Sequence, residues 1–180
     1  MRKMKNIVFV TLSLTILAWG KAFADHDPYQ KFFGEYSGET AYELDGVEYK
    51  RDLSVSISPV EDGFNVAWKT TTHKPASKPK EKSYSIDFVS TDREHVYSSA
   101  MKANLFGGRE ALDPMKGDPY VWARVNGTTL TVYALLVTND GGYDMLVYTR
   151  TLTADGLDLE FTRLRDNEPL REVNATLIKQ

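Results

Sequence analysis

The chain has 180 residues, of which 42% are hydrophobic and 26% charged, and it contains no cysteine. Its formal net charge of −3 argues against nucleic acid as the main partner, because phosphate binding needs a basic face. Without cysteine there is neither a disulfide nor a thiolate nucleophile, so the fold has to rely on a packed core.

Residues 1–24 have the pattern of a secretory signal peptide. Three basic residues within the first five positions precede an apolar stretch from Ile7 to Trp19, and Ala22-Phe23-Ala24 provides a small-x-small cleavage site. The apolar stretch is shorter than the roughly 20 residues of a membrane span. Cleavage after Ala24 removes four basic and no acidic residues, which changes the net charge from −3 to −7. We therefore expect a periplasmic or secreted protein whose residues 25–180 form one domain.

The first half of the mature chain predicts five strands, at 33–43, 47–59, 63–73, 82–91 and 95–101. The residues alternate with a period of two: Leu53, Val55 and Ile57 face one way, and the serines between them face the other. One dry and one wet face on each strand is typical of antiparallel sheets with one solvated side.

Two connections in this region are long. Residues 73–82 contain two prolines and four lysines, which indicates a solvated hairpin loop, with a basic contact for anionic head groups as the alternative. Residues 102–118 carry apolar side chains, and the stretch from Met101 to Met115 has a weak helical period. This pattern indicates either a short helix or lid over one barrel mouth, or a packed crossover.

The second half predicts five more strands, at 119–125, 129–138, 143–152, 157–165 and 170–178. Hairpin turn signals separate them: Asn126-Gly127, Asp140-Gly141-Gly142, Asp155-Gly156 and Asp166-Asn167. We therefore expect an all-β, antiparallel up-and-down meander that closes into a barrel of about eight to ten strands, with a two-sheet sandwich as the alternative. A membrane-spanning barrel is disfavoured, because the bulky aromatics lie on the dry face and Ser, Asp, Lys and Asn on the other.

Alternation also brings arginines onto the apolar face of the late strands. Arg163 and Arg165 share a face with Phe161, and Arg150 shares one with Tyr148. A guanidinium at an apolar barrel mouth needs a partner, and the carboxylate or phosphate of a ligand would bind it in a bidentate way. The alternative is that Arg163 and Arg165 curl to water at the strand ends and pair with acidic neighbours, namely Glu160, Asp166 or Glu172.

The predicted ligand site combines these arginines with interior aromatics. The expected ligand-binding residues are Arg163, Arg150, Tyr148, Trp68, Phe88, Tyr97, Trp122, Tyr133 and Phe161. The alternative is that the aromatics fill a solid core.

Motifs for catalysis are missing from the sequence. It has no Gly-x-Ser-x-Gly elbow, no phosphate loop and no His-Glu-x-x-His helix, and its three histidines, His26, His73 and His95, have no partner at a catalytic spacing. We therefore expect a protein that is not an enzyme and that uses no cofactor or metal. A small isomerase or cyclase with few polar pocket residues is a third alternative.

The chain resembles the lipocalin-like (calycin) barrels in its strand layout. Gly34-Glu35-Tyr36 is similar to the Gly-x-Trp that opens lipocalins, and Thr138-Asn139-Asp140 is similar to their Thr-Asp-Tyr turn. The resemblance implies that Arg171 or Arg163 packs over the first-strand aromatic, and that the barrel holds a lipid or another apolar small molecule. Tyr36 stands where lipocalins have Trp, and no C-terminal helix pattern follows the last strand.

These observations favour an exported periplasmic barrel that binds or carries a hydrophobic small ligand such as a lipid, with an anionic group as a further expectation. The competing hypothesis is an envelope interaction or inhibitor protein with a solid barrel that meets a protein partner through residues 73–82 and 102–118.

Overall fold

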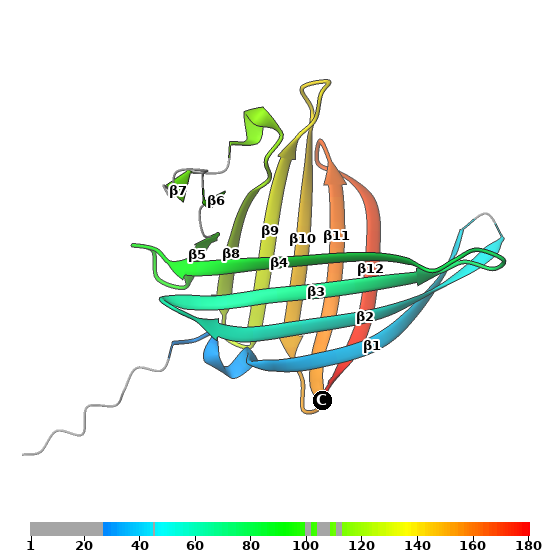
Figure 1. Ribbon diagram of the computed structural model, residues 1–180, viewed down its shortest axis with the longest axis horizontal. Coiled ribbons are helices and arrows are strands. Elements are labelled where there is room, and N and C mark those ends of the chain that lie inside the picture. Colours follow the sequence, from blue (N-terminus) through cyan, green and yellow to red (C-terminus); the bar gives the residue numbers. More distant parts are fainter. Residues whose placement is uncertain (1–26, 45, 100–101, 104–108, 111–112) are drawn as a thin grey trace, which may run out of the picture.

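The computed structural model describes residues 27–44, 46–99, 102–103, 109–110 and 113–180 (Figure 1). The predicted signal peptide therefore lies outside the described residues, as do residues 104–108 and 111–112 of the predicted helix, lid or crossover at 102–118. Within the described part, no helix is long and apolar enough to cross a membrane.

Ten antiparallel strands form one closed barrel in the order β1-β12-β11-β10-β9-β8-β5-β4-β3-β2. Their bounds are β1 Gly34–Leu44, β2 Val47–Val60, β3 Gly63–His73, β4 Lys80–Ser90, β5 Val96–Ser99, β8 Tyr120–Asn126, β9 Thr129–Val137, β10 Tyr143–Leu152, β11 Gly156–Arg165 and β12 Glu168–Lys179. Each barrel strand pairs with the preceding strand of the barrel, β8 pairing with β5, and β12 returns to pair with β1. The prediction of an all-β meander that closes into a barrel is confirmed.

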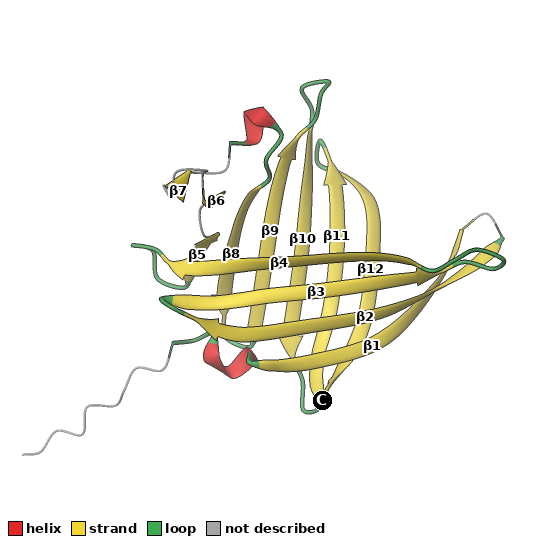
Figure 2. Cartoon of the chain, in the orientation of Figure 1, coloured by secondary structure: helices red, strands yellow, loops and turns green. Residues whose placement is uncertain are grey.

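The remaining described elements are short. β6 (Lys102–Ala103) and β7 (Arg109–Glu110) form a separate two-stranded ribbon, and two 3-10 turns, η1 (Gln30–Phe32) and η2 (Pro114–Lys116), precede β1 and β8. Figure 2 shows how little of the described chain is helical.

The barrel wall consists of two groups of strands that cross at a steep angle. Figure 1 shows β1–β4 running across the strands β8–β12. The ring closes where β12 meets the start of β1, at the pairs Tyr36–Lys179 and Ser37–Ile178. Gly38 follows immediately, and a Cβ there would lie 2.3 Å from the Thr176 carbonyl oxygen, so this close approach of the two backbones requires glycine.

One end of the interior is filled by apolar side chains. Phe64 is fully buried, and its ring lies 4.7 Å from that of Tyr29, 5.3 Å from Phe88 and 5.1 Å from Tyr97. Phe32 of η1 is also fully buried against this cluster, so the short turn before β1 closes this end of the barrel. We call it the packed end. The other end of the interior contains the candidate site.

Candidate functional site

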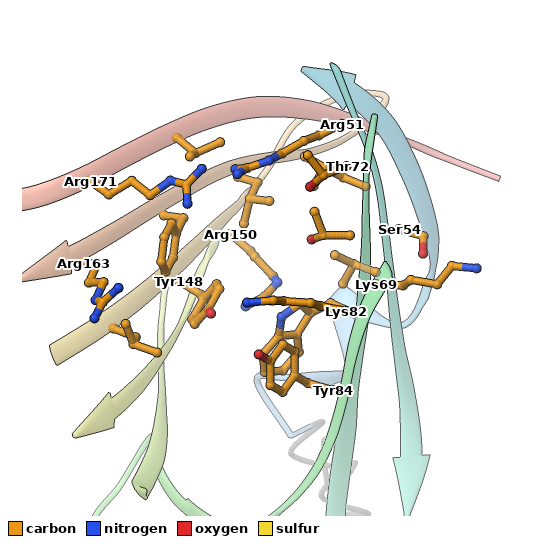
Figure 3. Close-up of a pocket in the computed structure, with 18 of the residues that line it drawn as sticks. Arg51, Ser54, Lys69, Thr72, Lys82, Tyr84, Tyr148, Arg150, Arg163 and Arg171 are labelled. Atoms are coloured by element: carbon orange, nitrogen blue, oxygen red, sulfur yellow. The ribbon is translucent and has the colours of Figure 1, made fainter. Parts of the chain in front are cut away.

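The far end of the barrel from this aromatic cluster contains a cavity of about 350 Å³. Inner-facing residues of both strand groups line it: Arg51, Leu53, Val55, Trp68, Thr70, Thr72, Lys80, Lys82, Tyr84, Leu136, Asp144, Leu146, Tyr148, Arg150, Leu159, Phe161, Arg163, Arg171 and Val173. Ser54 and Lys69 also border it, but Figure 3 shows both side chains pointing away from the others. Lys80, Lys82 and Arg171 are exposed, which identifies their level as the mouth of the cavity.

Strand alternation explains why these residues share the cavity. On β10, Asp144, Leu146, Tyr148 and Arg150 occupy every second position and therefore project to the same face. On β11, Phe161 lies opposite Tyr148, and Leu159 lies opposite Arg150. The cavity thus has layers, with the mouth at the level of Arg163 and the deepest polar group at the level of Arg150.

Aromatic rings form the middle layer. Trp68 stacks on Tyr84 with ring centroids 5.1 Å apart and also lies 5.1 Å from Tyr148, whose ring is 4.7 Å from that of Phe161. Burial raises the pKa of Tyr148 to about 12, so its phenol is protonated at neutral pH and can donate a hydrogen bond. These rings provide an apolar wall with a small number of polar atoms, which is the usual lining of a small-molecule site.

Arg150 is the most unusual residue of the cavity. Its side chain is 0% exposed, and neither its Nε nor its Nη1 has a hydrogen-bond partner. The guanidinium carbon lies 5.5 Å from the ring of Trp68 and 5.7 Å from that of Tyr148, so cation–π contacts stabilise it in part. Desolvation lowers its pKa to about 10, and it is therefore still charged at neutral pH. A buried cation with unmade hydrogen bonds is poised to receive an anion.

The carboxylate of Asp144 does not pair with Arg150, because two other arginines bind it. Asp144 accepts a hydrogen bond of 2.6 Å from Arg165 Nε and one of 2.6 Å from Arg163 Nη2. These bonds, that of Arg165 foremost, hold the pKa of Asp144 below its usual range. The expected acidic partners of these arginines were Glu160, Asp166 or Glu172, and the structure corrects this to Asp144, which lies directly opposite Arg165 in the β10–β11 ladder.

The lining has a strong excess of positive charge. Asp144 is its single carboxylate among the described residues, against four arginines and the lysines Lys80 and Lys82 at the mouth. The chain as a whole is acidic, so this local excess concentrates positive potential in one hollow. No group of three or more His, Asp or Glu side chains in the described part of the chain is placed to hold a metal ion.

The structure brings together five of the nine predicted ligand-binding residues. Those that line the cavity are Arg163, Arg150, Tyr148, Trp68 and Phe161. Phe88 and Tyr97 face the interior as expected, but they belong to the packed end and do not line the cavity.

The structure corrects the predicted placement of Trp122 and Tyr133. Both lie on the outer face of the barrel, where their rings stack 4.9 Å apart, since the buried residues of β8 are Val121, Ala123 and Val125. Arg124 and Asn126 share the face of Trp122, and two polar residues at this spacing are the signal that identifies it as the wet face.

Several of the residues that line the cavity were not predicted from the sequence. Arg51 shares its face with Leu53 and Val55, and Arg171 shares its face with Val173, so strand parity could have placed both inside. The resemblance implied that Arg171 or Arg163 would pack over Tyr36. Instead, the ammonium of Lys179 lies 5.7 Å from the Tyr36 ring, and Arg171 lies over Tyr42, further along the same strand.

Among proteins of known structure, one chain is similar to this protein. The S-type phycobiliprotein lyase of Guillardia theta is similar over 85% of this chain and 90% of that chain, with 6% sequence identity and a TM-score of 0.32. No protein-family model matches the sequence, and no curated protein sequence matches it. The chain's own cavity is therefore the basis for inferring its function.

Proposed function

We propose that the protein is an exported, non-enzymatic carrier that binds an apolar small molecule bearing an anionic group, and that Arg150 binds the anion. The observation that carries this proposal is the complete burial of Arg150 with two donor nitrogens unpaired. Burying a charge without a partner costs several kcal/mol, so an apolar residue of the same size would give a more stable barrel. A ligand carboxylate would supply the missing acceptors through a bidentate contact.

The rest of the cavity suits the apolar part of such a ligand. Its wall of Trp68, Tyr148, Phe161 and aliphatic side chains offers apolar contacts, and its volume of about 350 Å³ lies within the range of ordinary small-molecule sites. The competing interaction-protein hypothesis assumed a solid barrel, and the cavity removes that assumption.

Export is part of the same proposal. The pattern of residues 1–24 supports it, and we propose a periplasmic or secreted form that begins at Asp25. Mass spectrometry of the protein isolated from the cell envelope tests this directly, and a chain that retains Met1 or Arg2 would contradict it.

Binding is tested by titrating the protein with hexadecanoate and with hexadecanol, which differ only in the head group. We expect hexadecanoate to bind more tightly, and Arg150→Gln to weaken its binding by about tenfold or more while changing hexadecanol binding little. The matched control is Arg124→Gln, which removes the same charge from the outer face of β8. Equal binding of acid and alcohol, or equal effects of the two variants, would overturn the assignment of Arg150.

A further inference from the structure

A second group of arginines lies at the cavity mouth. Arg51 of β2 donates a hydrogen bond of 3.0 Å from Nη2 to the Tyr42 hydroxyl, and its guanidinium carbon lies 4.3 Å from the centroid of that ring. The guanidinium carbon of Arg171, on β12, lies 5.3 Å from the centroid of the same ring. Tyr42 itself is held by stacking on Tyr49, with centroids 5.0 Å apart. One tyrosine therefore brings two cations together.

No ion pair among the described residues balances the charges of this pair. The buried Nε of Arg51 has no hydrogen-bond partner. Desolvation, followed by the charge of Arg171, lowers the pKa of Arg51. Arg171 also lies directly opposite Arg163 in the β11–β12 ladder, where like charges repel each other. Both effects would be relieved by a bound anion.

This group is separated from Arg150 by the aromatic layer. Along β11, Arg163 marks the level of Arg171, and Leu159 marks the level of Arg150. Four residues of strand correspond to about 13 Å. Phe161 and Tyr148 face each other between the two levels. Figure 3 shows Arg51 and Arg171 pointing toward one another above Arg150.

We infer that Arg51, Arg171 and Tyr42 form a second anion site at the mouth, so that the ligand is an amphiphile with two anionic groups separated by an apolar segment. This inference rests on the proposed function, because Arg150 binds the inner anion. The two guanidinium groups receive the outer anion, the Tyr42 hydroxyl keeps Arg51 in place, and the rings of Trp68, Tyr148 and Phe161 contact the segment between.

The test compares a monoacid and an α,ω-diacid of equal length, dodecanoate and dodecanedioate, by calorimetric titration. We expect the diacid to bind about tenfold more tightly, the gain from one further charge-assisted contact at a partly exposed site. The double variant Arg51→Gln/Arg171→Gln should abolish this advantage and leave monoacid binding within about twofold of the native protein. A series from decanedioate to octadecanedioate should show an optimum length set by the distance between the sites.

The matched control is Arg93→Gln/Arg124→Gln, which removes the same charge from exposed positions away from the mouth. If it reduces the diacid advantage as much as the mouth variant does, general electrostatic attraction explains the advantage and the inference fails. The inference also fails if the diacid binds no better than the monoacid. If monoacid binding still depends on Arg150 in that case, the proposed function remains valid. Monoacid binding that depends on the mouth pair and not on Arg150 would overturn both.

Discussion

The two ends of the barrel interior differ in composition: one is filled with aromatic rings, and the other holds cationic side chains around a cavity. At the packed end, Tyr29, Phe64, Phe88 and Tyr97 fill the space with rings that contact one another at 4.7 to 5.4 Å. At the cavity end, β10 carries the buried Arg150, and an excess of cations surrounds a hollow. The packed end gains stability from every buried ring, whereas the cavity end retains groups that lower it. The difference indicates that the packed end stabilises the barrel and that the cavity end is suited to bind an anionic ligand.

The largest expected effect is at the packed end. Phe64→Ala removes a fully buried ring with three aromatic neighbours, and it should lower the free energy of unfolding by about 3–5 kcal/mol. Denaturant titration measures the loss. Hexadecanoate affinity of the folded fraction should change by less than about twofold. A large loss of affinity in the folded protein would show that the two ends are not independent.

Arg150→Met should stabilise the protein, in contrast to Phe64→Ala. Replacing an unpaired, fully buried cation by an apolar side chain should raise the free energy of unfolding of the ligand-free protein by about 1–3 kcal/mol, reduced by the loss of the contacts with Trp68 and Tyr148. The same variant should lose the preference for hexadecanoate over hexadecanol. Thermal unfolding and calorimetry together check both parts, and a destabilised variant with intact acid binding would make Arg150 a structural residue.

Asp144→Asn should destabilise the mouth at neutral pH by about 1–2 kcal/mol, discounted because Arg163 and Arg165 are 40% and 34% exposed. The pKa of Asp144 is lowered in the folded state, so its contribution is complete above the usual aspartate range and is lost as the pH falls through the folded pKa. The difference in stability between the native protein and the variant should therefore shrink below about pH 4. A difference that stays constant from neutral pH to pH 2 would contradict this account.

The smallest expected effect is that of Arg171→Gln. Removing one of two arginines that face each other across β11 and β12 should raise stability by a few tenths of a kcal/mol at low ionic strength. Added salt should reduce the gain, because it screens the repulsion in the native protein. A loss of stability on substitution would mean that Arg171 is balanced within the chain.

Much of this fold follows from local sequence signals. The strands at 63–73 and 143–152 were predicted with the bounds that the structure gives to β3 and β10, because Asp62-Gly63 and the Asp140-Gly141-Gly142 turn mark where they start. Period-two alternation placed Arg150 and Arg163 on the inner face, and the structure agrees. These features depend on neighbours in the chain, so they can be read without tertiary structure.

Other features depend on how distant strands meet. The pairing of Asp144 with Arg165 follows from the β10–β11 register across 21 residues, and residues closer in sequence were expected instead. That Phe88 fills the packed end while Trp68 lines the cavity depends on how far along the barrel each layer lies, which no single strand reveals. The grouping of Arg51 with Arg171 depends on the closure of the ring, since β2 and β12 are separated by β1.

The positions of Trp68 and Trp122 give the barrel a spectroscopic reporter of its own. Of the three tryptophans in the chain, Trp19 belongs to the predicted signal peptide, Trp122 is stacked on Tyr133 outside, and Trp68 lines the cavity. Trp68 also contacts the guanidinium of Arg150, so an anion that binds there changes the electric field at its indole ring. Emission from Trp68 after Trp122→Phe therefore follows occupancy of the inner site without a label or a competing probe.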